Sequence, residues 1–403
     1  MKNIFTDLQL VNLKTGQCTS GCALVVEDGR FVEITSTPGE GETISLNGGF
    51  VLPGLIDAHV HLVWEGQPDP AQYTITESPV MTSYRAARSA WQNLAGGVTT
   101  VRDVGGPHNI PIELAKAVKQ GIVPGSRILA AGAGIAQTGG HGYFMCREAD
   151  GFDEIRKAVR EQVKAGADLI KLMCSGGAYT QGESIHAMQF SDKEIHIAVQ
   201  TAKAAGKKVA AHALPDLAVK TCLEAGVDTI EHAALINDKS LHLFKRTGAF
   251  MVPTLAPYYL MATQGAEYGV PNYAVIKSQQ VMEQYITSLK KVVSTGVNLA
   301  LGTDAGSPQL PHPALPYEAW LWYKEAGLDP LTILKAATQG SAWALGLEHE
   351  LGEIKRGYLA DFVVYEKNPV EEITALHYPQ YVYKEGQLAA GASVIWSVSL
   401  LHS

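Results

Sequence analysis

Two histidines separated by one residue, His59 and His61, are the first side chains in the 403-residue chain whose types and spacing could carry chemistry. They end an apolar run at residues 55–62 that predicts a β-strand. Residues i and i+2 of a strand point to the same face, so both imidazoles are expected on the same side of the protein. A His-x-His pair alone is weak evidence, because it arises readily by chance.

Four more side chains of metal-ligand type fall in other predicted strands. Lys171 lies inside the apolar run 169–173, where an amine is costly unless it is neutralised, paired or modified. The other three end further apolar runs and are His212, His232 and Asp304. Imidazole and carboxylate suit zinc and similar divalent ions, and an open coordination position makes such a site catalytic. The whole set therefore predicts a catalytic metal site.

The elements that must position these side chains alternate between strand and helix. The expected strands are residues 55–62, 98–104, 127–132, 169–173, 209–212, 229–232, 250–255 and 298–303. Eight strands alternating with helices predict an α/β fold of the (β/α)8 TIM-barrel type, in which catalytic groups lie at the C-terminal ends of the strands. A doubly wound sheet is the rival, but no G-x-G-x-x-G motif follows an early strand.

Both chain ends have a different texture, with short strands and turns. Examples are the runs 22–27 and 31–34, separated by the hairpin signal Asp28-Gly29. Neither end has enough strands for a closed core alone. We therefore expect residues 1–54 and 352–403 to form one composite β-sandwich domain, and residues 55–351 to form the barrel.

With these residues in view, the chain resembles the metal-dependent amidohydrolase superfamily. The matching segments are residues 53–61, Lys171, His212, residues 231–232, residues 302–304, and the run 351–361 after the barrel. The resemblance implies a binuclear site with two divalent ions, most simply zinc, and a Lys171 that is carboxylated by CO2. It assigns His59, His61 and Asp304 to the first metal, His212 and His232 to the second, and Lys171 to both.

Within this superfamily, two glycine-rich segments resemble the prolidase and imidazolonepropionase-like branch. They are residues 138–142, which include His141, and residues 175–177. In similar dipeptidases the corresponding histidine contacts the scissile carbonyl, so this role is carried to His141. One departure is that similar prolidases often place a tyrosine after the strand-five histidine, whereas Ala213 follows His212 here. The candidates to replace that contact are Tyr143, Tyr179 and Tyr258.

These features predict hydrolysis of an amide C–N bond in a small-molecule substrate. A metal-bridging hydroxide is expected to attack the carbonyl, with Asp304 acting as general base and then as general acid toward the leaving nitrogen, and with His141 stabilising the oxyanion. The favoured substrate is an Xaa-Pro-like dipeptide or an N-acyl amino acid. Its carboxylate could bind in a nest of backbone N–H groups at Gly176 and Gly177.

The walls of the substrate site are expected to be largely apolar. The proposed wall residues are Tyr143, Phe144, Met173, Tyr179 and Tyr258. His312, in a proline-rich loop after the last strand, could overhang the mouth. Arg102 and Asp103 are expected to pair with each other or to brace the metal ligands, and Glu231 to support them.

Other activities are open on the same metal site. A lactonase, a phosphotriesterase or another cyclic-amide hydrolase would use the same two-metal chemistry. Similar deaminases place His-x-x-Glu after strand five, whereas Ala-Leu-Pro follows His212 here. A non-catalytic scaffold is also conceivable, but a scaffold has no need to keep six ligands.

The composition indicates which kinds of partner and which compartment to expect. The net charge of −8 indicates no basic face, so we expect neither nucleic acid nor membrane as a partner. Five cysteines without a paired framework, and a first segment without an apolar signal core, favour reduced thiols and the cytoplasm. Similar proteins are homo-oligomers, and the stripe formed by Trp320, Trp322 and Tyr323 is a candidate for core or subunit interface.

Overall fold

A computed structural model describes residues 2–391 of the chain. One eight-stranded sheet is built from both chain ends, in the order β17-β16-β15-β5-β1-β3-β4, with β2 paired to β1. Its strands are β1 (Lys2–Val11), β2 (Cys18–Thr19), β3 (Ala23–Glu27), β4 (Arg30–Thr35), β5 (Glu42–Pro53), β15 (Phe362–Tyr365), β16 (Pro379–Lys384) and β17 (Gln387–Gly391). Residues 392–403 of the predicted composite domain lie outside the described residues.

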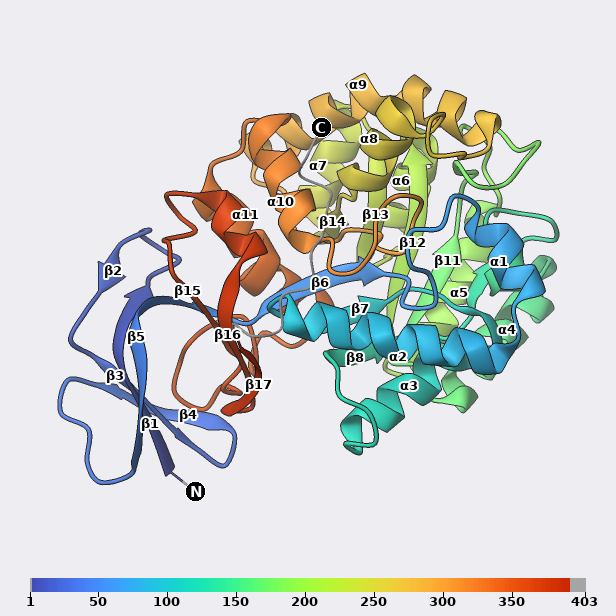
Figure 1. The fold of residues 1–403 in the computed structure, drawn as a ribbon. Helices are drawn as coiled ribbons and strands as arrows, with labels where there is room; N and C mark the ends of the chain where they lie inside the picture. The colour runs from blue at the N-terminus through green and yellow to red at the C-terminus, as the bar shows by residue number, and fades with distance from the viewer. Residues whose placement is uncertain (1, 392–403) are drawn as a thin grey trace.

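Local sequence explains how this sheet forms. The hairpin between β3 and β4 turns at Asp28 and Gly29, both with positive φ (50° and 76°), as the Asp-Gly signal predicts. Aromatic rings from the two chain ends pack together, with centroids of Phe5 and Phe362 5.0 Å apart. Figure 1 shows these strands, blue from the N-terminal end and red from the C-terminal end, beside the helix-rich part of the molecule.

Parallel strands form the part of the fold that carries the ligand-type residues. One sheet has the order β6-β7-β8 and another the order β10-β9-β11-β12-β13-β14. The strands are β6 (Leu55–Val60), β7 (Val98–Asp103), β8 (Arg127–Ala130), β9 (Gly134–Ala136), β10 (Cys146–Glu148), β11 (Leu169–Met173), β12 (Lys208–Pro215), β13 (Thr229–Leu235) and β14 (Phe250–Val252). This α/β arrangement is consistent with a TIM-barrel-like fold.

The predicted eighth strand, 298–303, is not a regular strand. Isolated parallel bridges join Leu299 to Met251 and Ala305 to Val60, so the segment lies between β14 and β6. The backbone N–H groups of Thr303 and Asp304 both donate to the carbonyl oxygen of His59, at 3.2 and 2.7 Å. In a regular parallel sheet, the hydrogen bonds of one strand are evenly spaced along the neighbouring strand. Two successive N–H groups that share one carbonyl oxygen therefore interrupt this pattern.

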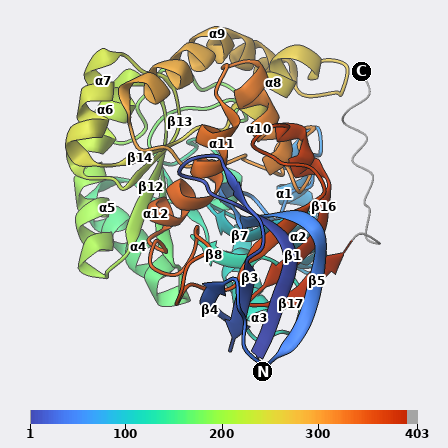
Figure 2. The ribbon, with the colours of Figure 1, turned by 90° about the vertical axis from the view of Figure 1, so that its left-hand side faces the viewer.

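Helices surround the parallel strands (Figure 2). They are α1 (Pro70–Thr76), α2 (Pro79–Ala95), α3 (Ile110–Lys119), α4 (Gly151–Ala165), α5 (Asp192–Ala204), α6 (Asp216–Ala225), α7 (Asp238–Thr247), α8 (Leu255–Gln264), α9 (Asn272–Thr295), α10 (Leu315–Lys324), α11 (Pro330–Lys335) and α12 (Ser341–Leu345). The predicted capping box of Ser191 and Glu194 opens α5. No helix within residues 2–391 has both the length and the apolar character that a membrane span requires.

The end of β14 corrects a second prediction. The apolar run 250–255 predicts one strand, but the strand ends at Val252 and helix α8 begins at Leu255. The N–H groups of Leu255 and Ala256 donate to the Glu318 carboxylate of α10, both at 2.7 Å. The side-chain oxygens of Glu318 satisfy N–H donors of the first turn that have no partner inside the helix.

Candidate metal centre and active site

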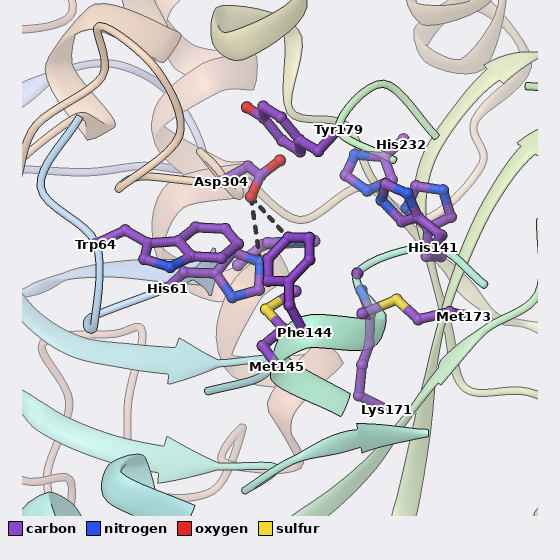
Figure 3. A pocket seen from close by; sticks show the side chains of 13 residues that line it. His61, Trp64, His141, Phe144, Met145, Lys171, Met173, Tyr179, His232 and Asp304 are labelled. Carbon is purple, nitrogen blue, oxygen red and sulfur yellow. Dashed lines mark ion pairs between the residues drawn. The ribbon is translucent and has the colours of Figure 1, made fainter. Parts of the chain in front are cut away.

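All six predicted ligand residues converge on one pocket. His59 lies on β6 and His61 directly follows it, while Lys171, His212 and His232 come from β11, β12 and β13. Asp304 completes the set from the segment that lies between β14 and β6. The pocket is lined by His59, His61, Trp64, His141, Gly142, Phe144, Met145, Lys171, Met173, Tyr179, His212, His232 and Asp304 (Figure 3).

His59, His61 and Asp304 form the tightest cluster. One ligand atom of each lies within 4.8 Å of the others. The Nε2 atoms of His59 and His61 are 3.5 and 3.3 Å from Oδ1 of Asp304 (Figure 3). The Nδ1 atom of His59 contacts Glu231 at 2.7 Å, and that of His61 contacts the carbonyl oxygen of Gly105 at 2.8 Å. These outer contacts leave both Nε2 lone pairs facing Asp304, as in a metal site whose histidines are oriented from behind.

His212 and His232 lie beside this cluster. Nδ1 of His232 contacts the hydroxyl of Thr254 at 2.7 Å, which leaves Nε2 as its ligand atom. His212 uses its two ring nitrogens in the opposite way. Its Nε2 contacts the carbonyl oxygen of Gly176 at 3.2 Å, which leaves Nδ1 as its candidate ligand atom. The ring centroids of the two histidines are 4.6 Å apart, and those of His59 and His232 are 5.1 Å apart.

Burial sets the protonation of these histidines. It lowers the pKa of His61 to about 3, and it lowers the pKa values of His59, His212 and His232 well below the usual value. All four rings are therefore neutral at physiological pH. A neutral imidazole offers one lone pair, which is the form that binds a metal ion.

Two titratable side chains, those of Asp304 and Lys171, complete the site. Burial raises the pKa of Asp304 to about 7 and lowers the pKa of Lys171 to about 8, while the negative charges of Glu231 and Asp304 raise the pKa of Lys171 in part. A neutral lysine amine can add CO2 to give a carbamate. The backbone of Asp304 has a positive φ of 57°, and that of His232 a positive φ of 69°, which is the kind of strain that collects at functional sites.

A buried ion pair supports His59, and it follows the second of the two predicted arrangements, in which Arg102 braces a candidate ligand. Arg102 does not pair with Asp103 but donates from Nη2 to Oε1 of Glu231 at 2.8 Å. The other oxygen of Glu231 is the one that contacts His59. Asp103 instead accepts the N–H groups of Leu62 and Gly105. Arg102 and Asp103 are neighbours on one strand and so point to opposite faces, which explains why they cannot meet.

His141 lies against the metal ligands. Its ring stacks on that of His212, with centroids 4.3 Å apart and planes inclined by 27°. Its Nδ1 atom is 2.8 Å from Oε1 of Glu183. Sequence reasoning missed Glu183, since the loop that carries it has no motif and lies 42 residues from His141 in the chain.

The predicted carboxylate nest is wrong. The N–H of Gly176 donates to the carbonyl oxygen of Ala187 at 3.0 Å, and the N–H of Gly177 donates to Glu183 at 2.8 Å. Both donors are therefore already used within the loop. Gly177 instead allows a close approach, because a Cβ atom there would lie 2.2 Å from the His141 ring.

The other predicted contact residues divide between pocket and periphery. Tyr179 lines the pocket, and its hydroxyl group is buried there. Tyr143 and Tyr258 are not among the lining residues, although the Tyr258 ring lies 5.8 Å from that of His232. His312 is buried behind the site, where Nδ1 contacts Asn93 at 2.9 Å and Nε2 contacts the carbonyl oxygen of His61 at 3.3 Å. His312 therefore supports the His61 backbone and does not overhang the mouth.

Comparison with known proteins agrees with this geometry. The model of the amidohydrolase family matches residues 50–389, and the chain belongs to that family. Ochratoxinase from Aspergillus niger is 28% identical over 376 residues, which cover 85% of this chain and 76% of that protein. Imidazolonepropionase from Symbiobacterium thermophilum is 25% identical over 395 residues, which cover 87% of this chain and 85% of that protein.

Solved structures extend the comparison. A Xaa-Pro dipeptidase with bound methionine in its active site superposes with a TM-score of 0.89 at 31% identity, covering 96% of this chain and 99% of the other. A prolidase in complex with N-methylphosphonate-L-proline gives a TM-score of 0.89 at 30% identity, over the same shares of the two chains. The chain is thus a hydrolytic enzyme of the prolidase and imidazolonepropionase-like branch.

Proposed function

We propose that this protein is a binuclear metal-dependent hydrolase that cleaves the amide C–N bond of an Xaa-Pro-like dipeptide or an N-acyl amino acid. The observation that carries the proposal is the convergence of four neutral histidines, a buried lysine and a buried aspartate on one pocket. The supporting relatives are a Xaa-Pro dipeptidase, a prolidase and ochratoxinase.

The donor set fits two divalent ions such as zinc. His59, His61 and Asp304 would hold the first ion and His212 and His232 the second, with a carboxylated Lys171 binding both. Ions bound there supply Lewis-acid activation of water and of the substrate carbonyl. The remaining imidazole nitrogens already have partners behind the site, so the ligand atoms are free to face the ions.

Asp304 is the proposed proton carrier. Its carboxylate accepts the proton of the attacking water and passes it to the leaving nitrogen, which an amide requires because an amide anion is a poor leaving group. His141 is proposed to stabilise the developing oxyanion with both ring N–H groups present: Nδ1–H donates to Glu183, and Nε2–H donates to the oxyanion.

Apolar walls favour an uncharged side chain in the substrate. Trp64, Phe144, Met145 and Met173 line the pocket together with Tyr179. Tyr179, which lines the pocket, is the proposed replacement for the tyrosine that similar prolidases carry after the strand-five histidine. Arginine or lysine in the substrate would bury a charge among these walls without a partner.

A substrate screen on the metal-loaded protein tests the proposal. The library contains dipeptides and N-acyl amino acids, with lactones, phosphotriesters, cyclic amides and purines as the competing classes. We expect hydrolysis of apolar Xaa-Pro dipeptides or N-acyl amino acids. Efficient turnover of a competing class, with every dipeptide and N-acyl amino acid left intact, would overturn the proposed substrate.

We also propose the larger organisation. Residues 55–351 form a closed (β/α)8 barrel, and residues 1–54 with 352–403 form the smaller β domain. The free state of all five cysteines supports a reducing compartment, for which we propose the cytoplasm. The protein is proposed to act as a homo-oligomer.

A further inference from the structure

The imidazole of His141 is held on several sides. It stacks on His212, and it packs against the backbone of Gly177, where no Cβ atom would fit. Its Nδ1 atom is hydrogen-bonded to Oε1 of Glu183 at 2.8 Å. Because this bond occupies Nδ1, Nε2 is the ring nitrogen left for a substrate.

Glu183 is itself fixed by further donors. Its Oε1 atom also accepts the N–H of Gly177 at 2.8 Å, and its Oε2 atom accepts Nε2 of Gln189 at 2.6 Å. The side-chain oxygen of Gln189 in turn accepts the backbone N–H of His141 at 2.9 Å. The hydrogen bonds therefore form a closed ring from the His141 side chain through Glu183 and Gln189 to the His141 backbone.

The surroundings make this ring stiff. The side chains of His141 and Glu183 are only 9% and 10% exposed, so water competes little for their bond. Burial raises the pKa of Glu183, but the hydrogen bonds from His141 and Gly177 outweigh it and lower the pKa overall. Glu183 is therefore ionised and acts only as an acceptor.

The loop that carries Glu183 is fastened to helix α9. Nζ of Lys277 donates to the carbonyl oxygens of Gly177 and Thr180, at 3.1 and 2.7 Å. The hydroxyl of Tyr273 donates to the carbonyl oxygen of Tyr179 at 3.0 Å. Helix α9 thus holds the loop from which the Glu183 carboxylate reaches His141.

We propose that Glu183 is a positioning residue for His141: it accepts Nδ1–H and holds the ring so that Nε2–H donates to the carbonyl oxygen of the substrate. The proposal rests on the proposed amide hydrolysis, in which His141 contacts that oxygen. The proposal distinguishes two possible roles of Glu183, stabilising the fold and positioning His141. A loop residue that only stabilises the fold would act without His141, whereas a positioning residue acts through it.

A double-mutant cycle separates these roles. We expect Glu183→Ala to lower kcat about 10- to 100-fold with little change in KM, the usual effect of losing the group that orients an active-site histidine. In a His141→Gln background the same substitution should change kcat less than about threefold, because the side chain it orients is already gone. An equal loss in both backgrounds would overturn the proposal.

Exchanging the side chains at positions 183 and 189 preserves the net charge and tests whether activity can be restored. In Glu183→Gln combined with Gln189→Glu, the amide oxygen introduced at position 183 can accept from His141 and Gly177. The carboxylate introduced at position 189 can accept from the new amide NH2 group and from the His141 backbone. Every hydrogen bond of the ring is kept, so we expect this variant to recover most of the activity that Glu183→Ala loses. An exchange variant as inactive as Glu183→Ala would contradict a positioning role.

A matched control comes from the same segment. Glu148 accepts the backbone N–H of Gly139 at 2.6 Å, and Glu148→Ala removes that support two residues from His141. We expect Glu148→Ala to leave kcat nearly unchanged. A loss equal to that of Glu183→Ala would show that loosening the segment is sufficient and would overturn the proposal.

A crystal structure of metal-loaded Glu183→Ala gives a readout that needs no substrate. We expect the His141 ring to turn away from its place beside His212 or to lose its density, with the metal content unchanged. An unmoved and ordered ring would overturn the inference. This readout stands even if the proposed substrates fail, so the two proposals can fail separately.

Discussion

Lys171 has almost no access to water and lies in a strand of apolar neighbours. Burial lowers the pKa of Lys171 to about 8. The negative charges of Glu231 and Asp304 act in the opposite direction and raise this pKa in part. A substantial neutral fraction at physiological pH makes the amine a nucleophile for CO2. The sequence alone pointed to this residue, because a lysine inside an apolar strand is costly unless it is neutralised, paired or modified.

Replacing Lys171 tests its role. We expect Lys171→Ala to lower kcat/KM by about three orders of magnitude, because a bridging anion is lost from between the two ions. Short-chain carboxylates such as acetate should restore part of the activity by entering the vacated space. Asp304→Asn is the control, since the same carboxylates cannot replace its proton transfer. Full activity of Lys171→Ala without added carboxylate would contradict the assignment.

Glu231 provides a second test at the residue scale. It joins His59 to Arg102 through its two oxygens, at 2.7 and 2.8 Å. We expect Glu231→Gln to weaken metal binding about 10- to 100-fold, because the amide can serve only one of these two donors with an oxygen. Metal titration of the apoprotein measures this. Glu113→Gln, at an exposed pair with Lys116, should leave metal affinity unchanged.

Glu183 marks the limit of sequence reasoning at this scale. The convergence of the six candidate ligand residues was predictable, because their types are chemically distinctive and each falls in or at the end of an apolar run. Glu183 reaches its partner through the path of a loop, which no periodicity describes. The predicted nest at Gly176 and Gly177 failed for the same reason, since only the folded loop shows that both N–H groups have acceptors.

At the scale of elements, apolar runs predicted most strands to within a few residues, and they failed where a distant side chain intervenes. Helix α8 begins inside the predicted seventh strand because the Glu318 carboxylate binds its first N–H groups. The same carboxylate also accepts the indole N–H of Trp322 at 2.5 Å. Glu318 lies more than sixty positions after the two N–H groups that it binds in α8, beyond the reach of any local pattern.

This contact predicts a measurable contribution to stability. We expect Glu318→Ala to lower the free energy of unfolding by about 2–4 kcal/mol, because it leaves three buried donors without an acceptor. Chemical denaturation of the metal-loaded protein measures the change. Asp329→Ala, which removes the exposed cap of α11, is the matched control and should cost about 1 kcal/mol. A loss at Glu318 no larger than at Asp329 would contradict this account.

At the scale of the whole molecule, the eight-stranded sheet is joined by a very short connection to a strand of the candidate site. Only Gly54 separates β5 from β6, the strand that carries His59. A Cβ atom at Gly54 would lie 2.2 Å from the hydroxyl of Thr99, so glycine is required at this junction. A second connection is made by Arg127 of β8, which binds Asp361 and Glu385 of the C-terminal segment, each at 2.6 Å. The two chain ends therefore contact β6, which carries His59, and β8, which lies in the same three-stranded sheet.

The surface offers an apolar region for the interface of the proposed homo-oligomer. The predicted stripe at Trp320–Tyr323 is interrupted, because Trp322 is fully buried within the chain. Exposed apolar side chains gather instead within residues 73–84, at the end of α1 and the start of α2; they are Tyr73, Ile75, Val80, Met81 and Tyr84. Exposed apolar patches of this kind commonly mark protein interfaces.

Sedimentation at micromolar concentration tests this expectation. We expect a dimer or larger assembly for the unmodified protein. The variant Val80→Glu combined with Tyr84→Lys should shift the equilibrium toward monomer, because it places charges on the exposed patch. The same exchange of an apolar for a charged residue at Ile122, which is exposed just after α3, is the control. A stable monomer for the unmodified protein would contradict the proposed oligomer.

Metal content together with the state of Lys171 tests the central claim most directly. The protein is purified with divalent metal and bicarbonate, its metal is counted per chain, and a crystal structure of the same active preparation is solved. The account predicts two metal ions per chain, with His59, His61 and Asp304 on one, His212 and His232 on the other, and a carboxylated Lys171 between them. Active protein with a single ion and an unmodified, unliganded Lys171 would contradict it.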